Sequence, residues 1–388
     1  MITINKKFDG VPLIINDYST QDIVLFDIET TGFVANKSYL YLIGCCYYKD
    51  NSWQLIQWFA QNIADEHEVI KSFLAFIKDF KVIIHFNGTT FDIPYVTYKC
   101  MFHNFPFSFE TLYSIDLYKH ANALKSLLHF DRCNQRALEK TLNITRKDPF
   151  TGGDLIQTYA NYVGIAQLEK LQQQRNGSNK MNRNTAYTLP ETSADELLNQ
   201  LLLHNEEDLI GLQALTCLLS YHSLSDGYYK IQNFYLDSLD HICFSLSLFQ
   251  ELPISFQVKQ DDIEIIGKDD LCMIRVSLYE GTLKYYISDY KNYYYLPLED
   301  SIIHKSIGNS IDKEYRKPAK KDNCYIKKTS IFLPQYQSTW EPVFSKEYKD
   351  TIHYFECSDE LLKDNTFLMS YTKELLTHLL FPKKSKDK

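Results

Sequence analysis

The sequence has no apolar run long enough to cross a bilayer. Its apolar runs, such as Ile23–Phe26 and Val82–Ile84, fall far short of the ~20 residues that a membrane-spanning helix needs. Residues Met1–Lys7 lack the apolar stretch of a secretory signal. We therefore expect a cytoplasmic protein without membrane contact.

Metal-binding cysteine spacing and phosphate-binding glycine loops are also missing. The nine cysteines are single, apart from the adjacent Cys45 and Cys46, and no C-x-x-C spacing occurs. This pattern argues against a structural zinc site or a disulfide framework, and it fits reduced thiols in a cytoplasmic compartment. Because no glycine-rich nucleotide loop is present, we expect no nucleotide cofactor.

An excess of positive charge is absent as well. The 41 Lys and Arg against 49 Asp and Glu give a formal net charge of −8. This balance argues against a protein that coats nucleic acid by charge alone, and it is compatible with an enzyme that gathers carboxylates around metal ions. A hydrophobic content of 45% excludes a disordered chain, and 388 residues suggest two or three domains.

The first ~220 residues alternate β-rich runs with helical patterns, which predicts an α/β fold with a mixed sheet flanked by helices. Three antiparallel strands in succession are plausible at the start. The expected strands are Gln21–Glu29, Tyr39–Tyr48, Trp53–Phe59, Lys81–Phe86 and Ser114–Leu117. The expected helices are Glu66–Phe80, Cys133–Asn143, Leu155–Leu171 and a long helix from Ser193, whose Ser193–Glu196 forms a capping box.

Composition predicts the division of the chain. Residues 1–20 are a lead-in, 21–222 a first domain with a polar, flexible insertion at 172–192, and 223–388 a smaller β-rich or α+β domain with a basic tail at 383–388. Strands are expected at Phe244–Leu252 and Ile263–Leu278, and a helix at Glu360–Leu380. The tyrosines of 279–295 could stack bases, but an ordinary antiparallel sheet is the favoured interpretation.

A first pair of acids ends the first strand, at Asp27 and Glu29. Strand side chains alternate between faces, so both carboxylates lie on one face. Two carboxylates together are costly unless a cation neutralises them, as a divalent ion with oxygen ligands does. The alternative is a solvent-facing strand edge.

Two further segments carry acids in similar contexts. Asp92 follows a buried strand and a glycine turn, just before a helix near Pro94, and it could simply be an N-cap. His204 and Asp208 are four residues apart and share one face of the late helix. The alternative there is an exposed polar patch, which Glu206 and Glu207 are expected to form.

Together these segments resemble the DEDD (DnaQ-like) 3′–5′ exonuclease superfamily, which has a ribonuclease H-like fold. The order is Asp-x-Glu on the first strand, Asp after a later strand, and His-x-x-x-Asp on a late helix. A longer series, over about residues 20–220, is similar to YprB-type ribonuclease H-like proteins. It comprises Asn87–Tyr95, Ile115–Leu117, Ala137–Lys140, Asn143–Arg146, Gly152–Gly153 and His204–Asp208.

The resemblance implies a two-metal phosphodiester hydrolase. Asp27, Glu29, Asp92 and Asp208 would hold two Mg²⁺ or Mn²⁺ ions, and His204 would be the general base. Family members with a catalytic histidine space it five residues before the last aspartate, and those with a tyrosine space it four. His204 has the tyrosine spacing, which rotates its side chain by about 100° around the helix.

The expected function is metal-dependent 3′–5′ exonuclease activity on single-stranded ends of DNA or RNA. Thr30, Asn87 and Phe91 are candidates for substrate contact, although Asn87 could instead fix its turn and Phe91 could pack in the core. Asp116 is an outer-shell acid or, more simply, a strand-end turn residue. Two alternatives stay open: a nucleic-acid-binding or recruiting protein with a weak or inactive site, and an endonuclease on RNA.

Overall fold

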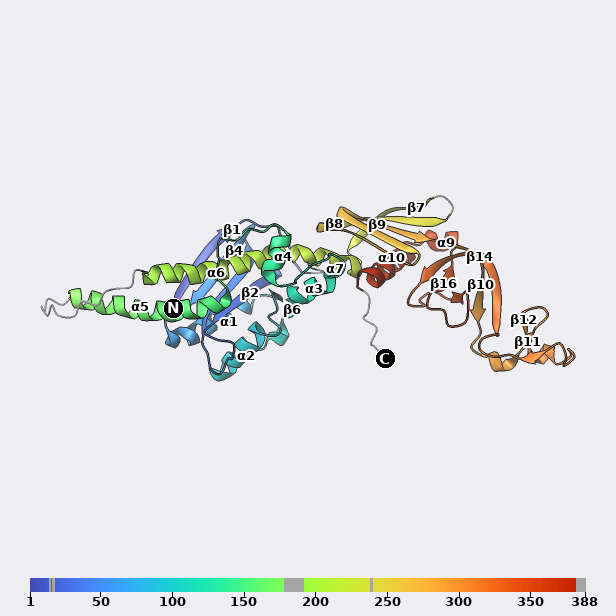
Figure 1. The fold of residues 1–388 in the computed structure, drawn as a ribbon, viewed down its shortest axis with the longest axis horizontal. Coiled ribbons are helices and arrows are strands. Elements are labelled where there is room, and N and C mark those ends of the chain that lie inside the picture. The colour runs from blue at the N-terminus through green and yellow to red at the C-terminus, as the bar shows by residue number, and fades with distance from the viewer. Residues whose placement is uncertain (14, 16–17, 178–191, 238–239, 382–388) are drawn as a thin grey trace. The chain divides into compact units, whose positions relative to one another are not determined.

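The computed structural model describes residues 1–13, 15, 18–177, 192–237 and 240–381 (Figure 1). The chain divides into two compact units, Met1–Leu219 and Ser220–Lys388. The predicted basic tail 383–388 and residues 178–191 of the predicted insertion lie outside the described residues. Among the helices that are described, none combines the length and apolar character needed to span a membrane.

A six-stranded mixed sheet forms the centre of the first unit. Its strand order is β1-β4-β3-β2-β5-β6; β5 and β6 run parallel to β2, and the remaining pairs are antiparallel. The strands are β1 Ile2–Phe8, β2 Ile23–Thr30, β3 Leu40–Lys49, β4 Ser52–Phe59, β5 Val82–His85 and β6 Tyr113–Asp116. The predicted mixed α/β sheet is therefore confirmed.

Residues 1–20, which the sequence predicts as a lead-in, contain the edge strand β1. It pairs antiparallel with β4, from Ile2 opposite Phe59 to Phe8 opposite Trp53. Most of its side chains are exposed, and Lys6 and Lys7 interrupt the apolar pattern. An edge strand with so few buried side chains gives a weak sequence signal.

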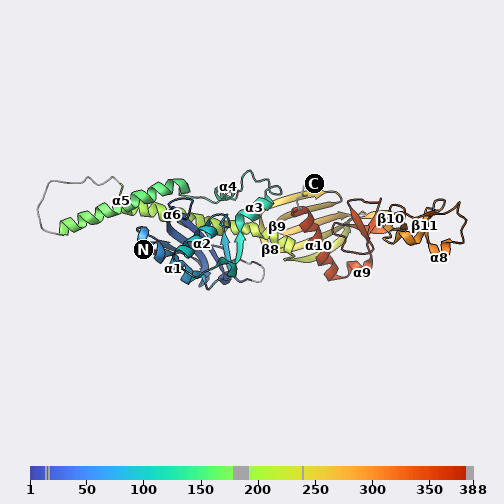
Figure 2. The ribbon, with the colours of Figure 1, turned by 90° about the horizontal axis from the view of Figure 1, so that it is seen from below.

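Helices flank this sheet. They are α1 Glu66–Ile77, α2 Asp92–Phe102, α3 Leu117–Leu124, α4 Gln135–Thr141, α5 Gly152–Gly177 and α6 Ala194–Leu215, with short 3₁₀ turns at Thr20–Asp22, Ile63–Asp65, Phe109–Thr111 and Thr216–Leu218. α6 packs against β2 and β3, α1 packs against β3 and β4, and α5 runs beside α6 (Figures 1 and 2). The predicted loop at 172–192 is wrong at its start, since residues 172–177 continue α5.

The ends of α6 and β2 are fixed by capping and burial. Ser193 forms the predicted capping box, in which the Glu196 N–H donates to its hydroxyl and its own N–H donates to the Glu196 carboxylate. In β2, Ile23–Phe26 is fully buried, and Phe26 stacks on Phe73 of α1 with ring centroids 5.7 Å apart. Burial of each such side chain stabilises the fold by roughly 1.5–3 kcal/mol. The acids that follow therefore start from a rigid strand.

The second unit is β-rich, as predicted. It contains a three-stranded sheet β7-β8-β9, a closed barrel β10-β14-β16-β15 and a small sheet β12-β11-β13, and α10 packs against β8 and β9. The strands are β7 Tyr229–Asp237, β8 His241–Gln260, β9 Ile263–Ser277, β10 Tyr279–Tyr286, β11 Tyr293–Leu296, β12 Ser301–His304, β13 Lys317–Pro318, β14 Tyr325–Gln335, β15 Phe344–Ser345 and β16 His353–Glu356. The helical elements are α7 Leu219–Asp226, η5 Tyr290–Asn292, α8 Lys305–Gly308, α9 Asp359–Leu362 and α10 Asn365–Leu380.

The C-terminal helix and one tyrosine of this unit bear on the sequence predictions. The helix expected over Glu360–Leu380 is broken, because Asp364 caps a new start by accepting a hydrogen bond from the Thr366 N–H at 2.8 Å. Within the tyrosine-rich stretch, Tyr285 packs on Phe344 of the barrel core, with ring centroids 6.1 Å apart. This contact favours a packing role for that tyrosine.

Candidate active site

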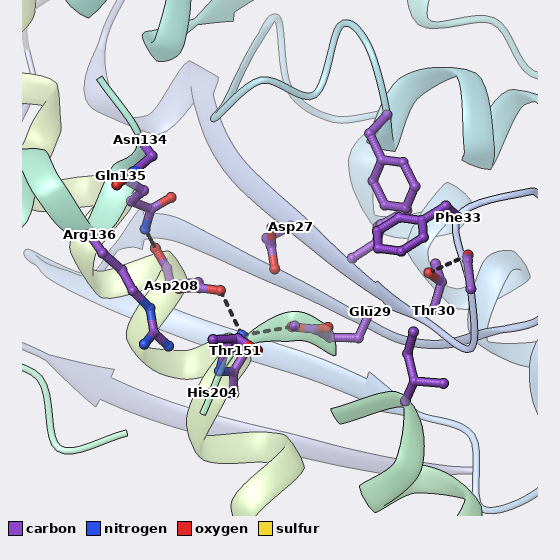
Figure 3. A pocket seen from close by; sticks show the side chains of 15 residues that line it. Asp27, Glu29, Thr30, Phe33, Asn134, Gln135, Arg136, Thr151, His204 and Asp208 are labelled. Carbon is purple, nitrogen blue, oxygen red and sulfur yellow. Dashed lines mark hydrogen bonds and ion pairs between the residues drawn. The ribbon is translucent and has the colours of Figure 1, made fainter. Parts of the chain in front are cut away.

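β2 brings the first two acids to a pocket of about 530 Å³ (Figure 3). Asp27 is half-buried and Glu29 is buried, and both line the pocket. They lie on one face of the strand because side chains alternate along it. The alternative of a solvent-facing strand edge is wrong, since β2 lies between β3 and β5 inside the sheet.

α6 adds His204 and Asp208 to the same pocket. His204 Nε2 lies 3.3 Å from Asp208 Oδ2 and 3.8 Å from Glu29 Oε1, so the imidazole stands between the two carboxylates (Figure 3). These three ligand atoms lie within 4.8 Å of one another. His204 is only 4% exposed, which rules out the alternative of an exposed patch for this residue.

Asp92 stands at the first position of α2 and does not line the pocket. The N-cap is Phe91, so the alternative that placed Asp92 at the cap is wrong. The turn before it is held by Asp116, which accepts hydrogen bonds from the Asn87 N–H at 2.8 Å and the Thr89 hydroxyl at 2.7 Å. Asp116 is thus a buried turn residue that positions the start of α2.

Burial and mutual repulsion dominate the electrostatics of the acids. Burial, and then the charges of Asp208 and Asp92, raise the pKa of Asp27 well above its usual value. Burial and the neighbouring carboxylates, Asp27 first, raise the pKa of Glu29 in the same way. Burial raises the pKa of Asp92 to about 7. The charge of Asp92 also contributes to the raised pKa of Asp27 and of Glu29, so this carboxylate acts electrostatically on a pocket that it does not line.

The donor set fits a divalent cation. Hard ions such as Mg²⁺ and Mn²⁺ take carboxylate oxygens, and Mn²⁺ also accepts an imidazole nitrogen. Two of these carboxylates are held by other groups: Asn205 Nδ2 donates to Asp27 Oδ2 at 2.8 Å, and Arg146 Nη2 donates to Asp208 Oδ1 at 2.5 Å. A bound cation would offset the repulsion among the acids, and this repulsion contributes to their raised pKa values.

Two residues of the site were not assigned a role from sequence. Asp148 accepts a hydrogen bond from His204 Nδ1 at 2.5 Å, and Arg146 Nη2 lies 2.5 Å from Asp208 Oδ1. Arg146 also pairs with the buried Glu139, at 3.1 Å. The segment Asn143–Arg146 is part of the family resemblance, but the resemblance does not show which side chains Arg146 contacts. Asp148 lies 56 residues before His204, so only the packing of the fold joins them.

Glu206 and Glu207 were expected to be a solvated patch, which is wrong for Glu207. Its carboxylate accepts hydrogen bonds from the Lys147 and Asp148 N–H groups, at 2.8–3.0 Å. Glu207 therefore holds the segment that carries Asp148. Glu206 forms an ion pair with Lys6 of β1.

The candidate substrate-contacting residues are divided by the structure. Thr30 and Phe91 line the pocket, whereas Asn87 does not; its Oδ1 accepts a hydrogen bond from the Thr90 hydroxyl at 2.9 Å. Sequence reasoning missed Phe33, which is 79% exposed at the pocket and meets Phe91 edge to face, with centroids 6.2 Å apart. The signal in the sequence was an aromatic residue directly after the turn residues Thr-Thr-Gly.

The sheet and its acidic pocket define a ribonuclease H-like nuclease fold. The model of the RNase_H superfamily family RNase_H_2 matches residues 24–220, half of the chain, and the chain belongs to this family. Members of the superfamily are mostly phosphodiester hydrolases.

No curated protein matches the sequence. Among solved structures, the chain is similar to the family B DNA polymerase from the hyperthermophilic archaeon Pyrobaculum calidifontis, with 12% identity and a TM-score of 0.37. The similarity covers 75% of this chain and 39% of the polymerase chain, so this chain spans well under half the length of that protein.

Proposed function

We propose that this protein is a metal-dependent 3′–5′ exonuclease of the YprB type, acting on single-stranded ends of DNA or RNA. The observation that carries the proposal is the meeting of Asp27, Glu29, His204 and Asp208 in one pocket of a ribonuclease H-like fold. The pairing of these residue types with this fold is what phosphodiester hydrolysis assisted by divalent ions requires.

The roles of the residues follow from their positions. Asp27, Glu29 and Asp208 would hold two divalent ions, with Asp92 completing the acidic set from the start of α2. Bound ions would supply activation of the attacking water and charge stabilisation on the leaving 3′-oxygen. The role of His204 as general base stays a prediction from the sequence.

The aromatic pair at the pocket supports action on chain ends. Phe33 and Phe91 offer faces on which bases stack, an interaction worth roughly 1–3 kcal/mol per base. The pocket volume of about 530 Å³ lies in the range of sites that take one small ligand, roughly 300–1,000 Å³. A single terminal nucleotide is small enough for such a site.

The test is a time course on single-stranded DNA and RNA labelled at the 5′ end, with Mg²⁺ or Mn²⁺ and with EDTA. We expect a ladder that shortens from the 3′ end, is absent in EDTA and is lost in Asp27→Asn. The exposed Asp79, outside the site, provides the matched control Asp79→Asn, which should behave like the wild type.

Circular substrates separate the remaining candidates. Cleavage of a circular substrate would show that the protein is an endonuclease and not an exonuclease. Substrates that stay intact with both ions but bind the folded protein would replace the enzyme by a binding or recruiting protein.

A further inference from the structure

His204 is held in one orientation by a buried carboxylate. Its Nδ1 lies 2.5 Å from Asp148 Oδ2, and both side chains are at most 5% exposed. An ionised carboxylate can only accept hydrogen bonds, so His204 Nδ1 is the donor in this contact. With the proton on Nδ1, the nitrogen of a neutral imidazole that can bind a metal is Nε2.

Asp148 is in turn fully engaged by other groups. Its Oδ1 accepts a hydrogen bond from the Phe150 N–H at 3.0 Å, and its Oδ2 also accepts one from Arg136 Nη2 at 3.0 Å. Arg136 thus forms an ion pair with this carboxylate, and Glu207 holds the backbone by accepting hydrogen bonds from the Lys147 and Asp148 N–H groups. The orientation of His204 is therefore built into the fold.

The opposite ring nitrogen points into the acidic pocket. Nε2 lies 3.3 Å from Asp208 Oδ2 and 3.8 Å from Glu29 Oε1, and Figure 3 shows it between these two carboxylates. One nitrogen and two carboxylate oxygens thus converge within 4.8 Å of one another. A histidine that donates its other N–H to a carboxylate is the usual arrangement of a metal-ligating histidine.

We propose that His204 is a metal ligand, that Asp148 is its positioning residue, and that the site therefore selects Mn²⁺ over Mg²⁺. The inference rests on the proposed function, because it takes this pocket as the metal site. It assigns His204 to the metal in place of the general-base role that the sequence predicts. Mg²⁺ prefers oxygen ligands in near-ideal octahedral geometry, whereas first-row transition metals accept imidazole nitrogen.

The test is pulsed electron paramagnetic resonance of Mn²⁺ added to the full-length chain. Electron spin echo envelope modulation detects the nitrogen of a coordinated imidazole directly, without any nuclease assay. We expect nitrogen modulation in the wild type and none in His204→Gln. His67→Gln, on an exposed histidine of α1, is the matched control and should keep the modulation.

Asp148→Asn tests the positioning role without removing the ligand. Loss of an outer carboxylate partner typically costs about 10–100-fold in metal affinity. We expect that loss for Mn²⁺, measured by titration, and a much smaller change for Mg²⁺, measured by competition against the Mn²⁺ signal. In the wild type, Mn²⁺ should bind more tightly than Mg²⁺. Circular dichroism at the titration temperature verifies that each variant is folded.

The result that overturns the inference is bound Mn²⁺ without nitrogen modulation in the wild type, or nitrogen modulation that persists in a folded His204→Gln. Failure of the proposed function gives a different result from failure of the ligand assignment. If the chain shows the nitrogen modulation but degrades no nucleic acid, the exonuclease proposal is wrong and the assignment of His204 as a metal ligand stands. A chain that degrades nucleic acid with no nitrogen modulation loses only the ligand assignment.

Discussion

The carboxylates of the pocket lie close together; Glu29 is buried, and Asp27 and Asp208 are half-buried. Burial and the neighbouring charges raise the pKa values of Asp27 and Glu29 well above their usual range. Two groups partly offset this repulsion at Asp27: the Asn205 amide, which donates to it, and the Arg146 guanidinium. The metal-free protein therefore bears an electrostatic cost that bound cations would remove.

Neutralising one of these acids should separate stability from function. We expect Asp27→Asn to raise the melting temperature in EDTA, because it removes a charge from the cluster while Asn205 keeps an acceptor. The same variant should lose most of the stabilisation by Mn²⁺ and roughly 100-fold or more of any nuclease activity. Thermal unfolding with EDTA and with MnCl₂ measures the first two effects. A melting temperature that falls in EDTA while Asp79→Asn leaves it unchanged would contradict the electrostatic explanation.

Individual elements deliver these residues through tight local contacts. The turn between β5 and α2 is built on His85, whose Nδ1 accepts the Gly88 N–H at 3.0 Å and whose Nε2 lies 2.8 Å from the Ser114 hydroxyl. This bonding requires the neutral ring with its proton on Nε2. Burial lowers the pKa of His85 to about 4. The turn that leads to Asp92 thus contains a group that resists protonation.

This histidine predicts a pH dependence of folding. Above the unfolded pKa of about 6.5, His85 is neutral in both states and its contribution is fully present. As the pH falls towards 4, the unfolded chain binds a proton that the folded chain does not, so stability drops by up to about 3 kcal/mol. We expect His85→Asn, which keeps an acceptor for Gly88, to be less stable at pH 7.5 but less sensitive to pH between 6.5 and 4. Urea unfolding at several pH values measures this; slopes that equal those of the wild type would refute it.

The contact of α6 with β3 depends on a glycine. A Cβ on Gly44 would lie 2.0 Å from Asn205 Oδ1 and 2.5 Å from Leu209 Cδ1. We expect Gly44→Ala to destabilise the fold by about 1–3 kcal/mol and to weaken Mn²⁺ binding, because it pushes Asn205 away from Asp27. Gly164→Ala is the control: nothing lies near its Cβ in α5, and it should stabilise by about 0.5–1 kcal/mol. Chemical unfolding and Mn²⁺ titration test both, and normal Mn²⁺ affinity in Gly44→Ala would contradict the predicted link.

Elements with a strong local signal were predictable, and contacts made by packing were not. β2 was visible because Ile23–Phe26 is a buried apolar run, and the start of α6 because Ser193 and Glu196 form a capping box. β1 was missed because an exposed edge strand has little hydrophobic pattern. Asp148 was missed because its partner is distant in sequence and no local pattern encodes the contact. The positions of Asp27 and Glu29 could therefore be predicted, and the orientation of His204 could not.

The whole molecule is divided into two units, and every residue of the candidate site belongs to the first. The site residues end at Asp208, before the unit ends at Leu219. We expect a fragment of residues 1–222 to unfold cooperatively and to bind Mn²⁺ as the full chain does. Circular dichroism melts and Mn²⁺ titration of the fragment test this. The predicted domain boundary would be contradicted by a fragment that is unfolded, or by a folded fragment that does not bind Mn²⁺ although the full chain does.

In the proposed function, the acids that meet at this pocket hold divalent ions. The most direct measurement is the number of Mn²⁺ ions bound by the full-length chain, read from the free-ion paramagnetic resonance signal during titration, because it needs no knowledge of the substrate. We predict two ions per chain, with binding reduced in Asp27→Asn and unchanged in Asp79→Asn. Absence of Mn²⁺ binding by the folded wild type, or equal binding by the folded Asp27→Asn, would show that these acids do not form a metal site.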